Sequence, residues 1–385
     1  MANNNNKDKC NVPHLRFPEF SGEWKKCKFG DIATGFDYGM NAAAKPFDGE
    51  NKYIRITDID EASSTYNDKD IVSPDGRLTD NYVVNNRDIL LVRTGASTGK
   101  SYLYRKSDGK LYYAGFLIRA NITEHNPYFV FSQLHTHRYW RWVSIMSARS
   151  GQPGINSQEY SSFPIFTTSL HEENKISTLL SLLNERIVTQ NKIIEDLKKL
   201  KSAISLKMLH SCSWEQFKIK DIATIGRGRV ISSVEISQQV NPTYPVYSSQ
   251  TSNEGIMGYL DDYMFEGEYV SWTTDGANAG TVFYRNGKFN CTNVCGLLKL
   301  RKGFDAHFVS LVLAEATKKY VSINLANPKL MNNTMGNIQI RLPNLEEQKR
   351  ISIVFRKLQE LLAMHNSLLN VYSMQKQYLL SQMFI

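Results

Sequence analysis

Long apolar runs are missing from this sequence of 385 residues. No stretch approaches the roughly 20 apolar residues that a membrane-spanning helix needs. The Asn-rich N-terminus shows no apolar segment of the kind found in secretory signals, so we expect a cytoplasmic protein without a membrane partner. Hydrophobic residues make up 42% of the chain and charged residues 22%, which is typical of a globular protein with two or three domains.

Cysteine is scarce, and its spacing argues against the common zinc sites. None of the cysteines forms a Cys-x-x-Cys pair, and the eight histidines show no ligand spacing either. The five cysteines are Cys10, Cys27, Cys212, Cys291 and Cys295. We interpret them as reduced thiols and expect no metal site.

Catalytic motifs are also missing. Residues 95–101 resemble a phosphate-binding P-loop, but only three residues separate the two glycines where that motif needs four. Residues 241–244 resemble the Asn-Pro-Pro-Tyr motif of amino-methyltransferases, but the third residue differs and no glycine-rich cofactor loop accompanies them. No paired-carboxylate nuclease core and no Ser-His-Asp or Cys-His arrangement stands out. We therefore predict a chain that is not an enzyme and carries no cofactor of its own.

A long helix is the strongest positive signal, and we predict it over residues 170–212. Seam positions recur with a period of 3.5 residues, which is the spacing of a coiled coil. No Gly or Pro interrupts the segment, and charged residues fill much of the remaining surface. The seam residues are Ile176, Leu180, Leu183, Ile187, Gln190, Ile194, Leu197, Lys201, Ile204 and Met208.

The same pattern returns in residues 344–385. Its polar interruptions coincide with those of the first helix, since Gln190 aligns with His365 and Lys201 with Lys376. If the two helices run antiparallel with Leu170 opposite Ile385, then Gln190 lies opposite His365. We predict that this polar pair sets the register of the coiled coil. The alternative is that each is merely tolerated at a wet seam. The second seam consists of Ile351, Phe355, Leu358, Leu362, His365, Leu369, Tyr372, Lys376, Leu379 and Met383.

The segments before the two helices also repeat each other. Trp24 and the Asp-Ile-Ala-Thr sequence at 31–34 return as Trp214 and residues 221–224, and the glycine turn at 95–99 returns at 276–280. Such a repeat indicates an internal duplication. We predict an α/β (α+β) fold in which two globular units alternate with two long helices around a pseudo-two-fold axis. The predicted segments are a disordered N-terminus (1–14), a first unit (15–168), a helix (169–212), a second unit (213–343) and a second helix (344–385).

The charge of the chain favours a polyanionic partner. The net charge is +9 and the pI about 9.1. The glycine turns are consistent with tight turns between strands, or with loops whose backbone approaches a phosphodiester. Our candidate DNA contacts are basic residues, which would bind phosphates, and polar loop residues, which would choose the sequence; the alternative for each is a solvated surface or turn residue. They are Arg93, Ser97, Thr98 and Lys100 in the first unit, and Arg227, Arg229, Asp275 and Asn278 in the second.

Taken in duplicate and in order, these features resemble the specificity subunits of type I restriction-modification systems. The resemblance rests on Leu-Arg-Phe-Pro at 15–18 with Trp24, on Pro-Asn-Leu-Glu-Glu-Gln at 343–348, and on residues 379–384. It implies two α/β target recognition domains that each read half of a split double-stranded DNA site, and an antiparallel coiled coil that sets the spacer. Residues 169–174 depart from the helix-opening motif that residues 345–348 match well.

The resemblance also implies partner subunits that supply the chemistry. These are two modification subunits, which methylate adenine with S-adenosylmethionine, and restriction subunits that use ATP and Mg²⁺. Two other hypotheses remain open on the residues alone. A coiled-coil scaffold or adaptor would explain the helices but not the basic charge, and a methyltransferase acting by itself would require S-adenosylmethionine to bind this chain.

Overall fold

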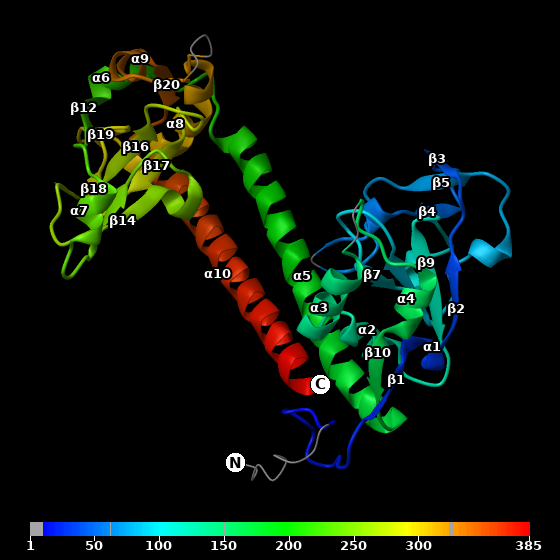
Figure 1. Ribbon diagram of the computed structural model, residues 1–385. Coiled ribbons are helices and arrows are strands. Elements are labelled where there is room, and N and C mark those ends of the chain that lie inside the picture. Colours follow the sequence, from blue (N-terminus) through cyan, green and yellow to red (C-terminus); the bar gives the residue numbers. More distant parts are fainter. Residues whose placement is uncertain (1–10, 62, 149–150, 323–326) are drawn as a thin grey trace. The chain divides into compact units, whose positions relative to one another are not determined.

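The computed structural model describes residues 11–61, 63–148, 151–322 and 327–385. Its internal contacts divide the chain into two units, Met1–Ile193 with His365–Ile385, and Ile194–Met364. Two helices, α5 (Leu170–Met208) and α10 (Leu345–Met383), contribute to both units (Figure 1). The predicted segment 169–212 therefore ends as a helix four residues early. Of the segment predicted to be disordered, residues 1–10 lie outside the described residues.

The globular part of the first unit is built on an antiparallel sheet with the order β2-β9-β6-β7. Its strands and helices are β1 (Lys25–Lys28), α1 (Phe29–Ile32), β2 (Ala33–Tyr38), β3 (Ala43–Pro46), β4 (Lys52–Ile54), β5 (Val72–Asp75), β6 (Asp88–Val92), β7 (Ser101–Leu103), β8 (Leu111–Tyr113), β9 (Leu117–Ile122), α2 (Pro127–Gln133), α3 (His137–Met146), α4 (Ser157–Ser162) and β10 (Pro164–Thr167). Smaller pairs are β1-β10, β3-β5 and β4-β8.

Strand β6 shows how the sequence places the core. All five of its residues are buried, which fits its continuous apolar run. Because side chains alternate along a strand, Ile89 and Leu91 belong to the core cluster that also includes residues of α2 and α3, whereas Leu90 and Val92 belong to a cluster with β8. The strand is thus held on both faces up to the point where the glycine turn begins.

The second unit repeats this plan with the sheet β12-β19-β16-β17. Its elements are β11 (Glu215–Lys218), α6 (Ile219–Ile222), β12 (Ala223–Arg227), α7 (Ser233–Ser237), β13 (Tyr244–Tyr247), β14 (Ile256–Leu260), β15 (Phe265–Glu266), β16 (Tyr269–Thr273), β17 (Val282–Arg285), β18 (Lys288–Cys291), β19 (Cys295–Leu300), α8 (Ala306–Ala316), α9 (Asn332–Asn337) and β20 (Gln339–Leu342). A second sheet has the order β14-β13-β18-β15, and β11 pairs with β20 as β1 pairs with β10.

The duplication extends to individual hydrogen bonds. Glu173, in the first turn of α5, accepts a 2.8 Å bond from the backbone N–H of Asn126, the N-cap residue of α2. Gln348, in the first turn of α10, accepts a 2.9 Å bond from the N–H of Asp305, the N-cap residue of α8. Each long helix is therefore tied to its globular unit by the same contact, and the predicted internal duplication is confirmed.

Within each unit the two long helices pack antiparallel, as predicted. In the first unit, His365 Nδ1 lies 2.7 Å from Gln190 Oε1, and Lys376 Nζ donates to Asn184 Oδ1 at 2.8 Å. The partners on α10 therefore have falling residue numbers as the residue numbers on α5 rise, as in an antiparallel pair. In the second unit, Lys201 Nζ donates to Gln359 Oε1 at 2.9 Å. The two polar seam residues meet, while their effect on the register stays a prediction.

Replacing this polar pair by leucine tests its role. We expect the double variant Gln190→Leu/His365→Leu to be more stable than the natural chain by about 1 kcal/mol, because a partly buried polar pair gives way to apolar packing. Either single variant should lose about 1–2 kcal/mol, because one buried polar group is left without its partner. Thermal unfolding of the four proteins gives the coupling free energy. Additive single effects would rule out an interaction between these side chains.

The aromatic-rich residues 127–146 form two helices rather than one. Helix α2 ends at Gln133 and α3 begins at His137. Thr136 between them caps α3: its hydroxyl accepts from the N–H of Tyr139 at 3.3 Å and donates to the carbonyl of Gln133 at 2.8 Å. Competition of a Thr side chain with backbone hydrogen bonds is the physical reason for the break.

His135, in the same connection, is expected to make the first unit sensitive to acid. Its Nδ1 lies 2.9 Å from the carbonyl of Phe131 and its Nε2 2.9 Å from the hydroxyl of Ser64, an arrangement suited to the neutral ring. Burial, and then the charge of Lys376, lower the pKa of His135 to about 4. Since the folded pKa lies below the unfolded value of about 6.5, the stabilisation is complete above that value and is lost as the pH falls toward 4.

We expect this group to contribute about 3 kcal/mol to the pH dependence. Unfolding free energies of the natural chain and of His135→Gln, measured between pH 7 and pH 4, give this value directly. The variant should show a shallower loss across the window. An unchanged pH profile would contradict the assignment.

Candidate nucleic-acid interface

The glycine turn of the first unit is a rigid connection between β6 and β7. Gly95 and Gly99 have φ angles of +81° and +95°, which other residues adopt only with strain. The Gly99 N–H donates to the carbonyl of Val92 at 3.0 Å, and the buried Tyr139 hydroxyl donates to the Gly99 carbonyl at 2.7 Å. The turn is therefore held by the sheet on one side and by α3 on the other.

The second unit holds its turn between β16 and β17 in the same way. Gly276 and Gly280 have φ angles of +91° and +82°. The Gly280 N–H donates to the carbonyl of Thr273 at 2.8 Å, and the Thr317 hydroxyl donates to the Gly280 carbonyl at 2.8 Å. Although Thr317 replaces Tyr139 as the donor, the backbone of the two turns is the same.

Each turn is joined to a second loop. Gly95 donates its N–H to the carbonyl of Pro153 at 3.0 Å, and residues 94 and 154 form a β-bridge. Gly276 donates to the carbonyl of Pro328 at 3.0 Å, and Asp275 bridges Lys329. Both units thus present a pair of backbone-linked loops beyond the end of a buried central strand.

The structure places the predicted residues of the first unit in different environments. The guanidinium of Arg93 lies 4.7 Å from the centre of the Tyr38 ring, and Lys100 Nζ lies 3.5 Å from a Glu61 carboxylate oxygen that is largely exposed. Ser97 is partly exposed. Thr98 is 7% exposed, and its hydroxyl donates to the Gly95 carbonyl at 2.7 Å. Thr98 therefore supports the turn from inside, and its contact with DNA stays a prediction.

In the second unit, all four predicted residues have protein partners. Arg227 Nε donates to Asn332 Oδ1 at 2.8 Å, and Arg229 forms an ion pair with Glu235. Asp275 lies 3.6 Å from Lys329 Nζ, and Asn278 Nδ2 donates to the Ser249 carbonyl at 3.3 Å. Asp275 and Asn278 lie in the turn, whereas Arg227 and Arg229 lie at and beyond the end of β12. Their roles in binding remain predictions.

A cleft that includes Arg93 was not predicted from the sequence. It measures about 700 Å³ and is lined by Tyr38, Arg55 and Phe116, among others. Phe116 is 59% exposed, so its ring is accessible from the cleft. No local pattern marks these residues, because four segments that are separate in the sequence meet only in the fold.

The cleft holds cations and aromatic rings in fixed positions. The N–H of Ser157 donates to the Tyr38 hydroxyl at 3.3 Å, and the hydrogen bonding from Ser157 lowers the pKa of Tyr38. Arg55 binds both carboxylate oxygens of Asp58, at 2.9 and 2.8 Å. Cationic and aromatic side chains of this kind bind phosphates and the faces of bases. In the described parts of the chain, no group of three or more His, Cys, Asp or Glu residues is arranged to hold a metal ion.

Comparisons with known proteins identify relatives of this chain. Residues 212–371 match the family described as the type I restriction modification DNA specificity domain. A Mycoplasma pneumoniae protein (strain ATCC 29342 / M129), provisionally described as a type I specificity subunit N-terminus, is 46% identical over 140 residues, which are 36% of this chain and 74% of that protein. A second protein from this strain, provisionally described as a type I specificity subunit, is 36% identical over 192 residues, which are 49% of this chain and 80% of that protein.

In two other relatives from that strain, the match spans a little under half of the relative's length. The fold is also shared. The crystal structure of the S subunit of a type I restriction-modification system from M. genitalium superposes with a TM-score of 0.73 at 15% identity, covering 97% of this chain and 99% of that one.

Proposed function

Because the chain belongs to the specificity subunits of type I restriction-modification systems, we propose that each of its two units reads one half of a split double-stranded DNA site. The observation that carries this proposal is the pair of glycine turns. They share φ angles and anchoring bonds, but Ser97 of the first turn corresponds to Asn278 of the second, and Thr94 to Asp275. The same backbone with different polar side chains suits two different base sequences.

Affinity in this proposal comes from phosphate contacts. Arg93 and Lys100 flank the first turn, and the net charge of +9 supplies a long-range attraction. Base-edge contacts then come from the short polar side chains at the turns and from the cleft beside Arg93. Binding should therefore weaken steeply with salt.

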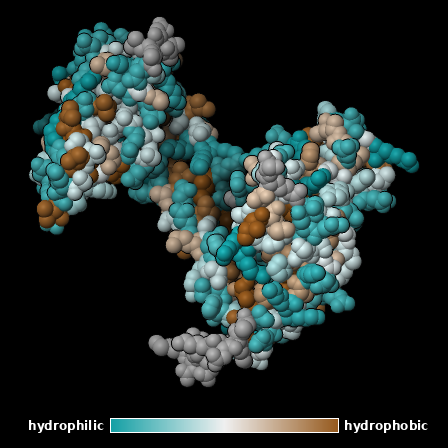
Figure 2. Space-filling view, in the orientation of Figure 1, coloured by the Kyte–Doolittle hydropathy of each residue, from teal (hydrophilic) through white to brown (hydrophobic). Residues whose placement is uncertain are grey.

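The two long helices provide the spacer and the docking surface. A helix of 39 residues is about 58 Å long, and a helix pair is stiffer than any flexible linker. Beyond the seam, α10 carries apolar side chains that the described protein leaves exposed, and Figure 2 shows apolar surface in the region of the two long helices. In the second unit these are Ile353, Leu361 and Met364, and in the first unit Val371, Met374 and Tyr378.

We assign these helices to the binding of two modification subunits, which in turn recruit restriction subunits. The chemistry, with S-adenosylmethionine, ATP and Mg²⁺, belongs in this proposal to those partners, and this chain supplies recognition alone. The part of the chain that the structure describes contains no candidate membrane-spanning helix. We propose a cytoplasmic location, where DNA and partners are available. Family membership argues against a scaffold without DNA specificity.

The test is a methylation map. The chain is expressed with its modification subunit in cells that lack other adenine methylation, and methylated adenines are located across the genome. A single split motif is expected. Exchange of residues 94–98 for the corresponding residues 275–279 should change one half of the motif and leave the other half intact. A stable complex without methylation, or a motif unaffected by the exchange, would contradict the proposal.

A further inference from the structure

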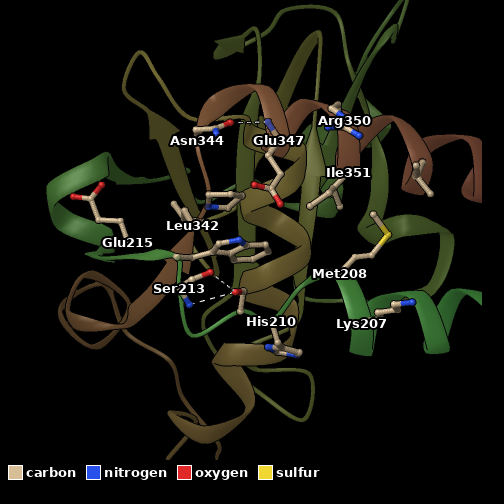
Figure 3. A pocket seen from close by; sticks show the side chains of 14 residues that line it. Lys207, Met208, His210, Ser213, Glu215, Leu342, Asn344, Glu347, Arg350 and Ile351 are labelled. Atoms are coloured by element: carbon tan, nitrogen blue, oxygen red, sulfur yellow. Dashed lines mark hydrogen bonds between the residues drawn. The ribbon is translucent and has the colours of Figure 1, made fainter.

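The start of α10 forms one wall of an open groove in the second unit. The cavity measures about 870 Å³ and is lined by residues from the end of α5, from the loop before β11, and from the first turns of α10. Figure 3 shows the Glu347 side chain pointing into it. Trp214 also lines the groove and is only partly buried.

The duplicated fold has an equivalent groove in the first unit, and that groove is filled by another segment of the chain. Glu172 and Trp24 are the counterparts of Glu347 and Trp214, because both helices and both globular units repeat. The chain segment 15–20 covers them, and Trp24 is 1% exposed as a result. Arg16 binds both oxygens of Glu172, each at 2.7 Å. Glu172 also accepts a 3.3 Å bond from Trp24 Nε1.

The covering segment makes a second set of contacts to Lys175. The ammonium of Lys175 lies 4.6 Å from the centre of the Phe17 ring and 6.0 Å from that of Phe20, and it forms an ion pair with Glu19. The segment is anchored at its start by the N–H of Leu15, which donates to the Gln382 carbonyl at 2.8 Å. An arginine, two aromatic rings and an acid thus fill the first groove.

The empty groove offers the same chemistry. Arg350 stands where Lys175 stands, and Lys207, in the last turn of α5, corresponds to Gln382. Among the described residues, the Glu347 carboxylate has no hydrogen-bond donor, although its N–H is bonded to Asn344 Oδ1 at 2.9 Å. No separate segment of the described chain covers this second groove, because α5 runs to Met208 and only residues 209–213 connect it to Trp214.

We propose that the groove of the second unit binds an extended segment of a protein partner, with an arginine that pairs with Glu347, adjoining aromatic side chains and an acid that pairs with Arg350. The charge pattern of the groove and its filled twin both point to this occupant. Lining by Leu342, Ile351 and Val354 suits the aromatic rings. This inference does not depend on DNA recognition.

A peptide with the sequence of residues 11–22 of this chain is the probe, labelled with a fluorophore and titrated with the full-length protein. We expect one peptide to bind per chain, with affinity about tenfold or more weaker for Glu347→Gln, because a charge-assisted bidentate bond is lost. Glu346→Gln, one residue away and exposed, is the matched control and should bind like the natural chain. A peptide with alanine in place of its arginine should not bind.

Exchanging the charges of the two proposed partners tests whether Glu347 itself pairs with the arginine of the peptide. Glu347→Arg should fail to bind the natural peptide and should bind a peptide that carries Glu in place of its arginine. Thermal unfolding checks that the variants remain folded. Absence of peptide binding, or equal binding by Glu347→Gln, would overturn the proposal. If the protein instead doubled in mass as its concentration rose, and the peptide prevented this dimerisation, the occupant would be a second copy of this chain. That result would also overturn the proposal.

Discussion

Arg16→Met is expected to destabilise the first unit by about 3–5 kcal/mol. The Glu172 side chain is 1% exposed, and both of its carboxylate oxygens bind the Arg16 guanidinium at 2.7 Å. Methionine keeps most of the side-chain volume but leaves a buried carboxylate without a counter-charge. The remaining donors, Trp24 Nε1 and the Thr168 hydroxyl, cannot neutralise it.

Chemical denaturation of the full chain measures the loss, and hydrogen exchange at the start of α5 locates it. Lys199→Met is the matched control, because its partner Glu195 and the lysine itself are about half or more exposed. That pair should contribute at most about 1 kcal/mol. Replacing Arg16 and Glu172 together by apolar residues should recover much of the stability. A loss below about 1 kcal/mol for Arg16→Met would show that the buried pair is not needed.

Gly99→Ala should cost about 2–4 kcal/mol and should also disturb one half of the DNA site. Its φ angle of +95° is strained for alanine, and an added Cβ would lie 2.7 and 2.9 Å from the two γ-methyl carbons of Val143. The turn must therefore move away from α3. Since the turn is proposed to face DNA, the shift should weaken one half-site and leave the other unchanged.

Two control variants distinguish the effect of backbone strain from that of a steric clash, and the effect of the first unit from that of the second. Gly49→Ala has a similar φ of +93° but no heavy atom within 4 Å of its Cβ, so it should show the strain alone. Gly280→Ala, whose Cβ would lie 2.6 Å from a Val321 methyl, should affect the opposite half-site. Thermal unfolding and methylation mapping measure both effects. If Gly99→Ala altered both half-sites alike, the turns would not read the halves separately.

Much of the architecture followed from local patterns. The spacing of seam residues such as Leu183 and Leu358 predicted the long helices and their pairing, because a helix buries whichever stripe its sequence makes apolar. The alignment of Gln190 with His365 placed two polar side chains opposite each other, and the structure brings them within 2.7 Å. Repetition of whole segments predicted the duplicated fold.

The candidate site was less predictable, because its contacts join distant segments. The sequence marked Thr98 and Arg229 as polar, but it could not show that the Thr98 hydroxyl turns inward to Gly95 or that Arg229 is paired with Glu235. The cleft that includes Tyr38, Arg55 and Phe116 has no local signature at all.

The sequence by itself determined the periodic elements and their duplication, because seam and turn residues act through their nearest neighbours along the chain. Only the tertiary structure decided what fills the groove at the start of the long helix in each of the two units. The groove at Glu172 is closed by the segment that contains Arg16, while the groove at Glu347 stays open. The physical reason is chain connectivity. In the first unit the end of α10 contacts the separate segment that contains Arg16, whereas in the second unit the end of α5 continues directly into the chain that leads to Trp214.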